Sequence, residues 1–279
     1  MKNFLRYFFC IFSYVLSAQT YNVMTYNIRY DNPNDGKNKW SIRKAYLCDQ
    51  IRYNQVDILG IQEGLHHQVV YIDSVFTDFN YVGVGREDAK EKGEYSAIFY
   101  HKTKLKILKQ GTFWLSETPN KISVGWDASM ERICTYSLFE NRNNKEQFWV
   151  FNTHFDHIGS IAQLESSKLI DVKIKELNQN NLPVILMGDL NLKPESEAIK
   201  YLSNVMNDSK AISVLKPFGP EGTFNGFKFN QPVKDRIDYI FTNKNIIQVN
   251  KFATLSDSKD CKYPSDHLPV VVEIEFILK

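Results

Sequence analysis

The sequence predicts a single layered α/β domain in which mixed β-sheets are covered by helices. Expected strands outnumber expected helices, and several strands follow one another directly, as antiparallel neighbours do. Some of the strands are continuous apolar runs, which is typical of strands buried on both faces. No repeat, low-complexity tract or linker interrupts the chain, so we expect one domain rather than two within its 279 residues.

The hydrophobic patterns place the elements in order. We expect strands at 21–30, 56–63, 81–85, 95–100, 105–108, 133–139, 147–152, 182–191, 236–241 and 268–277. We expect helices at 40–54, 66–76, 161–177 and 195–205. Strands 95–100 and 105–108 are expected to pair, and 133–139 and 147–152 to form a hairpin, whereas 111–130 and 209–233 are expected to be irregular. In the first two helices the spacing would turn Ile42 and Val70 inward, with other apolar residues.

The segment 182–191 has the most informative pattern. It begins as an apolar run and stops on Gly188, Asp189 and Asn191. If the backbone stays extended, Asp189 and Asn191 project to the same side, because side chains alternate along a strand. A carboxylate and an amide at a strand end suit the binding of a water molecule or a hydrated cation. The alternative is an ordinary polar turn.

The N-terminus has the pattern of a secretory signal. Lys2 and Arg6 precede a short apolar run at 8–16, and the small residues Ser17 and Ala18 follow. We therefore expect a signal peptide at 1–18, a single catalytic domain at 19–279, and export to the periplasm or the extracellular space. An uncleaved anchor is the alternative. No other stretch is apolar enough to span a bilayer, so we expect no stable membrane insertion.

Charge and cysteine content limit the classes of protein that fit the sequence. Without Lys2 and Arg6 the basic residues fall from 34 to 32, against 32 acidic residues, so the remaining chain is nearly neutral. Global charge therefore gives no support to nonspecific nucleic-acid binding. Cys48, Cys134 and Cys261 lack the spacing of a metal site and can form at most one disulfide, which excludes a disulfide scaffold.

Side chains that can bind a metal ion or transfer a proton lie at five strand boundaries. They are Asn27, Glu63, His154, Asp189 with Asn191, and Asp266 with His267. Each has an ordinary structural explanation by itself, but all lie beside strong core strands, whose ends can converge on one face. The set is rich in oxygen ligands and lacks cysteine, which favours Mg²⁺ or Mn²⁺ over zinc or copper.

Six short motifs give the chain a family resemblance. In order, they are 24–27, 61–63, 152–154, 188–191, 237–240 and 265–269. Through them the chain resembles the endonuclease/exonuclease/phosphatase superfamily of metal-dependent phosphoesterases. It is more similar to the deadenylase and deoxyribonuclease branches than to the abasic-site repair branch. The resemblance implies a four-layer αββα sandwich, with two mixed sheets packed face to face, outer helices, and an active site at one end of the sheets.

The resemblance also implies roles for the metal-binding group and for the group that handles water. Glu63 would be the principal ligand of Mg²⁺ or Mn²⁺, with Asn27 and Asp266 close to the metal and the phosphate. Asp189 would orient or deprotonate the attacking water. Asn191 would hold that water or the phosphate in place.

The remaining catalytic residues would act on the phosphoryl group. The resemblance implies that His154 and His267 contact its oxygens, and we expect imidazolium donors to stabilise the charge that develops there. Asp238 would hydrogen-bond His267 and fix its tautomer. No covalent nucleophile is needed, because a carboxylate beside a cation can take the proton from water.

Substrate-binding residues are less well defined. Arg86 and Arg132 are phosphate-contact candidates, although a solvated or salt-bridged arginine is the alternative for each. Trp126 and Phe224 could rim the site and stack on a base, a sugar ring or a headgroup, or they could cap the core. Asp156, shortly after His154, is assigned to the same substrate-binding group.

Three functions follow from this reading. The first is an exported Mg²⁺-dependent phosphodiesterase, including a nuclease acting on single-stranded nucleic acid. The second is a phosphatase or phosphodiesterase for small phosphorylated sugars, inositols or lipid headgroups, which the near-neutral charge favours slightly. The third, a noncatalytic binding module, is disfavoured because every acid, amide and histidine of the motifs is present. We expect the protein to be a monomer.

Overall fold

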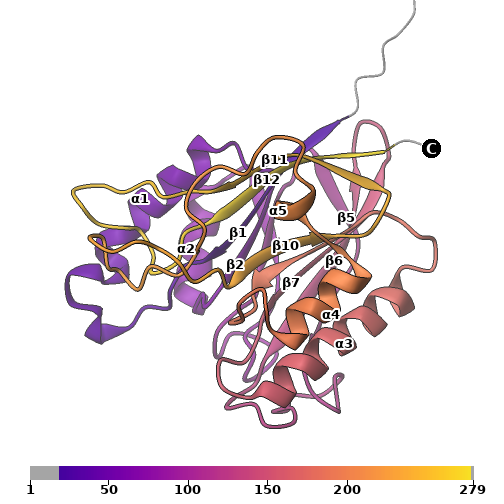
Figure 1. Ribbon diagram of the computed structural model, residues 1–279, viewed down its shortest axis with the longest axis horizontal. Coiled ribbons are helices and arrows are strands. Elements are labelled where there is room, and N and C mark those ends of the chain that lie inside the picture. Colours follow the sequence, from indigo (N-terminus) through magenta and orange to yellow (C-terminus); the bar gives the residue numbers. More distant parts are fainter. Residues whose placement is uncertain (1–18, 278–279) are drawn as a thin grey trace, which may run out of the picture.

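The protein contains two six-stranded β-sheets, which lie between the two helix pairs in Figure 1. The computed structural model describes residues 19–277, so the signal peptide expected at 1–18 lies outside the described part. The first sheet has the order β11-β12-β1-β2-β4-β3 and the second the order β5-β6-β7-β8-β10-β9. Both are mixed, because β1 and β2 run parallel in one and β7 and β8 run parallel in the other.

The bounds of the elements are as follows. The first sheet comprises β1 (Thr20–Asn27), β2 (Ile58–Gln62), β3 (Phe79–Val82), β4 (Ile98–His101), β11 (Ile247–Thr254) and β12 (Val270–Phe276). The second comprises β5 (Leu105–Trp114), β6 (Ile133–Asn141), β7 (Gln147–His154), β8 (Val184–Asp189), β9 (Asn207–Asp208) and β10 (Asp238–Thr242). The helices are α1 (Trp40–Tyr53), α2 (His66–Val75), α3 (Ser160–Leu177), α4 (Glu197–Val205) and α5 (Ser209–Ile212), with a 3₁₀ segment η1 (Pro33–Asn38).

Three hydrophobic clusters define the layers. The central cluster joins the facing sides of the sheets, for example Val23 of β1 with Ile185 of β8. A second cluster lies between the first sheet and α1 and α2, and a third lies between the second sheet and α3 and α4. In Figure 1 the two helix pairs accordingly flank the sheets on opposite sides. The four-layer αββα sandwich implied by the motifs is confirmed.

The two parallel strand pairs bring the motif residues to one end of the sandwich. In the first sheet, Asn27 at the end of β1 lies beside Gln62 at the end of β2, so Glu63 follows directly. In the second sheet, His154 of β7 lies beside Asp189 of β8, and Asp238 of β10 pairs with Asp189 from the other side. Parallel neighbours end at the same edge, which is why residues far apart in the sequence meet here.

Some predicted pairings and edges differ from the structure. The strands expected at 95–100 and 105–108 do not pair with each other. β4 pairs with β2 and β3, whereas β5 pairs with β6, so residues 102–104 cross between the two sheets. Strand β5 also continues to Trp114, into the segment expected to be irregular, and β11 was not predicted.

Helices α1 and α2 occur where expected, but their buried faces differ in detail. Ile42 is 59% exposed and Val70 is 45% exposed, although both were predicted to face inward. Arg43 of α1 is buried instead, because its guanidinium donates to the backbone carbonyls of Ile28 and Arg29 after β1. A buried charged group is tolerated where its donors find partners, so this helix face also holds the loop beside Glu63.

Gly188 is required by the close approach of β8 to β7. Its φ is +154°, and a Cβ there would lie 2.0 Å from the carbonyl oxygen of Thr153. We expect Gly188→Ala to lower the free energy of unfolding by about 3 kcal/mol, because the clash is with backbone. Gly36→Ala is the control, since Gly36 has a φ of +54° but no atom within 4 Å of its Cβ position. Equal melting temperatures for the two variants would contradict the steric explanation.

Candidate active site

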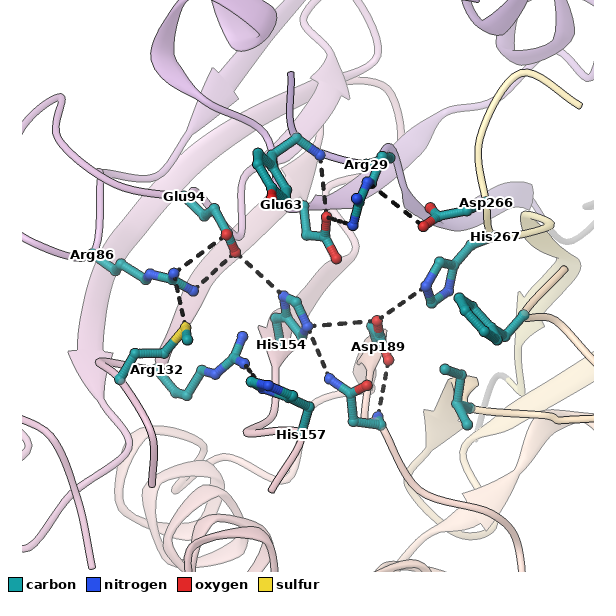
Figure 2. A pocket seen from close by; sticks show the side chains of 15 residues that line it. Arg29, Glu63, Arg86, Glu94, Arg132, His154, His157, Asp189, Asp266 and His267 are labelled. Carbon is teal, nitrogen blue, oxygen red and sulfur yellow. Dashed lines mark hydrogen bonds and ion pairs between the residues drawn. The ribbon is translucent and has the colours of Figure 1, made fainter. Parts of the chain in front are cut away.

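A cavity of about 460 Å³ lies at the end of the sandwich where the motifs converge (Figure 2). It is lined by Arg29, Tyr30, Glu63, Arg86, Glu94, Met130, Arg132, His154, His157, Asp189, Asn191, Phe224, Ile237, Asp266 and His267. Six of the eight residues assigned to metal binding or catalysis from the sequence are in this wall. The other two, Asn27 and Asp238, are buried behind it.

Asn27 links the two sheets beneath the cavity. Its side-chain nitrogen donates to Glu63 Oε1 at 2.9 Å and to Asp189 Oδ2 at 2.8 Å. Its side-chain oxygen accepts the backbone N–H of Arg29 at 2.9 Å. Asn27 was expected close to the metal, and the structure gives it a supporting position, because its oxygen is occupied by the backbone. It fixes the distance between the two carboxylates.

Asp189 and Asn191 come together in a different way from that predicted. The strand does not stay extended, since Asn191 has a φ of +51° and its backbone N–H donates to Asp189 Oδ1 at 2.9 Å. Glu63 also lies in the left-handed region, with a φ of +62°. Such conformations are uncommon for residues other than glycine and often occur at functional sites. Both strands therefore turn sharply where their polar residues begin.

The electrostatics of Asp189 suit a base. Burial, together with the negative charge of Asp238, raises the pKa of Asp189 to about 7. Its Oδ2 lies 3.7 Å from His267 Nε2 and 3.5 Å from His154 Nε2. A carboxylate with a pKa near neutrality can accept a proton from water and release it again.

His267 is held as a cation. Burial alone would lower its pKa, but the charges of Asp238 and Asp189 raise that pKa well above its usual value. Its Nδ1 lies 2.9 Å from Asp238 Oδ2, the hydrogen bond that the resemblance implied. Its Nε2 points into the cavity as a charged donor (Figure 2). In this protonation state both ring nitrogens are donors, so we expect Nε2 to donate to the substrate.

His154 is neutral, which corrects the expectation of two imidazolium donors. Burial, followed by the charges of Arg132 and Arg86, lowers its pKa well below the usual value. Asn191 Nδ2 donates to the Phe155 carbonyl at 3.1 Å, which identifies that atom as the nitrogen, and it lies 3.0 Å from His154 Nε2. Nε2 is therefore the acceptor and Nδ1 carries the proton. Within residues 19–277, Nδ1 has no hydrogen-bond partner.

The titration of His267 gives a pH prediction. Since its pKa is raised in the folded protein, the cation is present below that pKa and is lost as pH rises through it. Asp238→Asn removes a charge that raises the pKa of both His267 and Asp189. We expect both limbs of the kcat–pH profile to move to lower pH. Asp235→Asn, which changes a half-exposed carboxylate paired with Lys193, should leave both limbs in place. If the alkaline limb does not move in Asp238→Asn, that limb does not report the titration of His267.

The donor set fits a hard divalent cation. Glu63, Asp189 and His267 place one ligand-type atom each within 4.8 Å of one another. Two of these three groups are carboxylates, whose oxygens are preferred by Mg²⁺ and Mn²⁺. Asp266 also lines the cavity, with its Oδ2 3.7 Å from Arg29 Nε. Glu63, with Asp266 nearby, would hold the cation, and Asp189 would lie beside it as the base.

A bound cation should stabilise the fold, because it offsets the repulsion between buried carboxylates. We expect Mg²⁺ or Mn²⁺ at about 100 times its dissociation constant to raise the melting temperature by about 5 °C. Differential scanning calorimetry of chelator-treated protein measures this shift, with K⁺ at matched ionic strength as the control. An equal shift with K⁺ would mean that the site does not select a divalent cation.

The four residues assigned to substrate binding are placed differently from one another. Arg86 lines the cavity and pairs with Glu94 at 2.9 Å. Arg132 also lines it, with Nε 3.4 Å from Asp156 Oδ2. Asp156 is buried behind Arg132 and does not line the cavity, and neither does Trp126. Trp126 is therefore not a rim residue of this cavity.

Six lining residues were not identified from the sequence as members of the site: Arg29, Tyr30, Glu94, Met130, His157 and Ile237. Arg29 lies between Asp35, at 3.1 Å, and Glu63, at 3.9 Å. Glu94 is carried by the loop before β4, and His157 contacts Arg132 Nη2 at 3.1 Å. Arg29 follows the first motif by two residues, which is a usable signal. Glu94 lies in a polar loop, where nothing distinguishes it from its acidic neighbours.

Comparison with known proteins identifies the family. Residues 24–267 match the model of the endonuclease/exonuclease/phosphatase family. The chain belongs to this family. It is therefore a phosphoesterase by family, and enzymes of the family generally use a divalent metal, in agreement with the donor set described above.

Two solved structures of family members are closely similar to this chain. A family protein from Bacteroides thetaiotaomicron is 37% identical with a TM-score of 0.90, covering 94% of this chain and 100% of its own. A mannosyl-6-phosphatase from Bacteroides thetaiotaomicron VPI-5482 is 37% identical with a TM-score of 0.87, covering 92% of this chain and 100% of its own.

A more distant relative agrees with the branch indicated by the motifs. Mouse Nocturnin is 22% identical over 288 residues, covering 91% of this chain. The chain spans 65% of the length of that protein. This relative confirms the resemblance to the deadenylase branch of the family.

Proposed function

We propose that the protein is an exported, Mg²⁺- or Mn²⁺-dependent phosphatase that acts on small phosphorylated sugars. The observation that carries this proposal is the charge balance of the cavity. Each of its three arginines is paired with a carboxylate: Arg29 with Asp35 at 3.1 Å, Arg86 with Glu94 at 2.9 Å and Arg132 with Asp156 at 3.4 Å. A long polyanion would usually meet a groove with excess positive charge.

The size of the cavity and the relatives support the same substrate class. A volume of about 460 Å³ is in the range of small-ligand sites, which span roughly 300–1,000 Å³. The mannosyl-6-phosphatase that is 37% identical to this chain acts, by its name, on a phosphorylated sugar. The sugar variant of the hypotheses drawn from the sequence is therefore favoured over the phosphodiesterase variant.

Different residues of the site act in different parts of phosphoester hydrolysis. Asp189 accepts the proton of the attacking water, and Asn191 orients Asp189 through its backbone N–H. His267, as a cation, donates to the phosphoryl oxygens as negative charge develops, and His154 lines the cavity beside Asp189. When bound, the divalent cation would act as a Lewis acid that polarises the phosphoryl group.

A phosphodiesterase or nuclease acting on single-stranded nucleic acid is the second candidate. It is favoured by Arg132, which lines the cavity and would offer a positive charge to an additional phosphate. A noncatalytic binding role is disfavoured by the paired acid and base groups. Export after cleavage near residue 18 and the monomeric state stay predictions from the sequence. Among residues 19–277, no helix is both long and apolar enough to cross a membrane.

A comparison of three substrates tests the proposal. Purified protein with Mg²⁺ is assayed against mannose 6-phosphate, an aryl phosphodiester and a single-stranded oligonucleotide. We expect kcat/KM for the sugar phosphate to exceed that for the diester by about 10²-fold or more, with the oligonucleotide uncut. Oligonucleotide cleavage at a higher kcat/KM than sugar-phosphate turnover would replace this proposal with the nuclease.

A further inference from the structure

We propose that Glu94, held in place by Arg86, is the residue that determines specificity for the sugar. Its carboxylate would accept hydrogen bonds from hydroxyl groups next to the scissile phosphate and would disfavour substrates with a second phosphate at that position. This inference rests on the proposed sugar-phosphatase function and adds to it the group that recognises the part of the substrate that leaves.

Glu94 is a buried acid in the cavity wall that the hydrolysis does not use. Its Oε2 lies 2.9 Å from Arg86 Nη1 and its Oε1 lies 3.3 Å from Arg86 Nη2. The side chain is 17% exposed and lines the cavity. Trp114 fixes Arg86 in turn, since its Nε1 donates to the Arg86 carbonyl at 2.8 Å. The carboxylate is therefore pre-organised, which is what a recognition group requires.

The imidazole ring of His154 lies between Glu94 and the reaction centre. His154 Nδ1 lies 3.8 Å from Glu94 Oε2, and His154 Nε2 lies 3.5 Å from Asp189 Oδ2. Figure 2 shows the three side chains in a row across the cavity. A phosphoryl group that contacts His154 and His267 would thus place the first carbons of its leaving group within reach of Glu94.

The chemistry of the wall matches hydroxyl groups. An ionised carboxylate only accepts hydrogen bonds, and a guanidinium only donates them, whereas a hydroxyl does both. Glu94, Arg86 and Arg132 all line the cavity, and together they supply both kinds of atom. Phe224 and Ile237 line another part of the same cavity with apolar surface, which suits the C–H face of a sugar ring.

The carboxylate of Glu94 also disfavours the binding of substrates that carry a second phosphate. An anion placed beside Glu94 would face a like charge in a poorly solvated site, and like charges there are strongly disfavoured. Arg86 offsets this repulsion only in part, because both of its terminal nitrogens already bind Glu94. Bisphosphorylated sugars and oligonucleotides should therefore be poor substrates, in agreement with the charge balance of the cavity.

A substrate series combined with Glu94→Gln tests the inference. In wild-type protein, removing one hydroxyl from a hexose 6-phosphate at position 2, 3 or 4 should lower kcat/KM by about 10- to 100-fold for at least one position. In Glu94→Gln the intact sugar phosphate should lose a similar factor relative to an aryl phosphate, and the same deoxy analogue should lose little more. In Glu94→Gln, the ratio of kcat/KM for a hexose bisphosphate to kcat/KM for the monophosphate should rise about tenfold over that of wild type.

The control is Glu91→Gln, which changes an acid of the same loop that is 70% exposed and does not line the cavity. This variant should leave the ratio of kcat/KM for the sugar phosphate to kcat/KM for the aryl phosphate unchanged. Losses in Glu94→Gln that are equal for sugar and aryl phosphates, or that add to the deoxy effects, would overturn the inference. If Glu94→Gln does not fold, Glu94→Asp, which retracts the charge, replaces it in the same series. Wild-type protein that releases no phosphate from any hexose phosphate would instead refute the proposed function itself.

Discussion

Replacing Glu63 by glutamine is expected to reduce metal-dependent phosphoester hydrolysis by at least about 10³-fold. Glu63 carries one of the two carboxylates at the centre of the site, and Asn27 holds it opposite Asp189. Glutamine keeps the size of the side chain but removes the charge that a divalent cation requires. The measurements are kcat/KM at saturating Mg²⁺ and the Mg²⁺-induced rise in melting temperature, which should also disappear.

Asp31→Asn is the matched control for Glu63. Asp31 is an acid of the same region whose side chain is 35% exposed and pairs with His67 at 3.0 Å, outside the cavity. It should keep both turnover and the thermal shift within about twofold of wild type. Near-normal activity in Glu63→Gln, with the fold intact, would refute the assignment of Glu63 as the principal ligand.

Replacing His267 by alanine should lower kcat by about 10²- to 10³-fold with little change in metal affinity. Asp238 and Asp189 keep His267 a cation, and its Nε2 lies 3.7 Å from Asp189 Oδ2, beside the place where negative charge develops on the phosphoryl oxygens. Alanine removes this charged donor and leaves the two carboxylates in place. Isothermal titration with Mn²⁺, together with kcat, separates the two effects.

The neighbouring His267→Gln variant refines this prediction. Glutamine can donate a hydrogen bond but carries no charge, so its kcat should lie between those of wild type and alanine. His101→Ala is the control, since His101 lies at the end of β4 and pairs with Asp78 outside the cavity. Loss of Mn²⁺ binding in His267→Ala would show that His267 is a metal ligand and not a donor.

The sequence allowed the fold and the centre of the site to be predicted because both depend on strand ends. Parallel strands end at one edge, so acids and histidines directly after buried strands had to converge. Asp189 and His154 are adjacent for this reason, and Asp238 reaches His267 from the neighbouring strand. The hairpin of β6 and β7 was predicted on equally local grounds, from two alternating segments and a polar turn.

The features that were missed depend on contacts that sequence periodicity does not encode. Residues 102–104 switch between sheets, so two successive strands that look like a hairpin do not pair. Glu94 is one acid among several in a polar loop, and only its ion pair with Arg86 brings it into the wall. The neutral state of His154 follows from its burial and then from the nearby arginines, both of which are set by the tertiary fold, since each lowers its pKa.

The measurement that tests the account most directly is phosphate release from mannose 6-phosphate by chelator-treated protein, before and after addition of Mg²⁺ or Mn²⁺. We expect no release without the cation and a return of activity on its addition, with Ca²⁺ and K⁺ as comparison ions. Glu63→Gln should stay inactive under every condition. Phosphate release that is unchanged by chelation, or that persists in Glu63→Gln, would contradict the claim that these carboxylates form a metal-dependent phosphatase site.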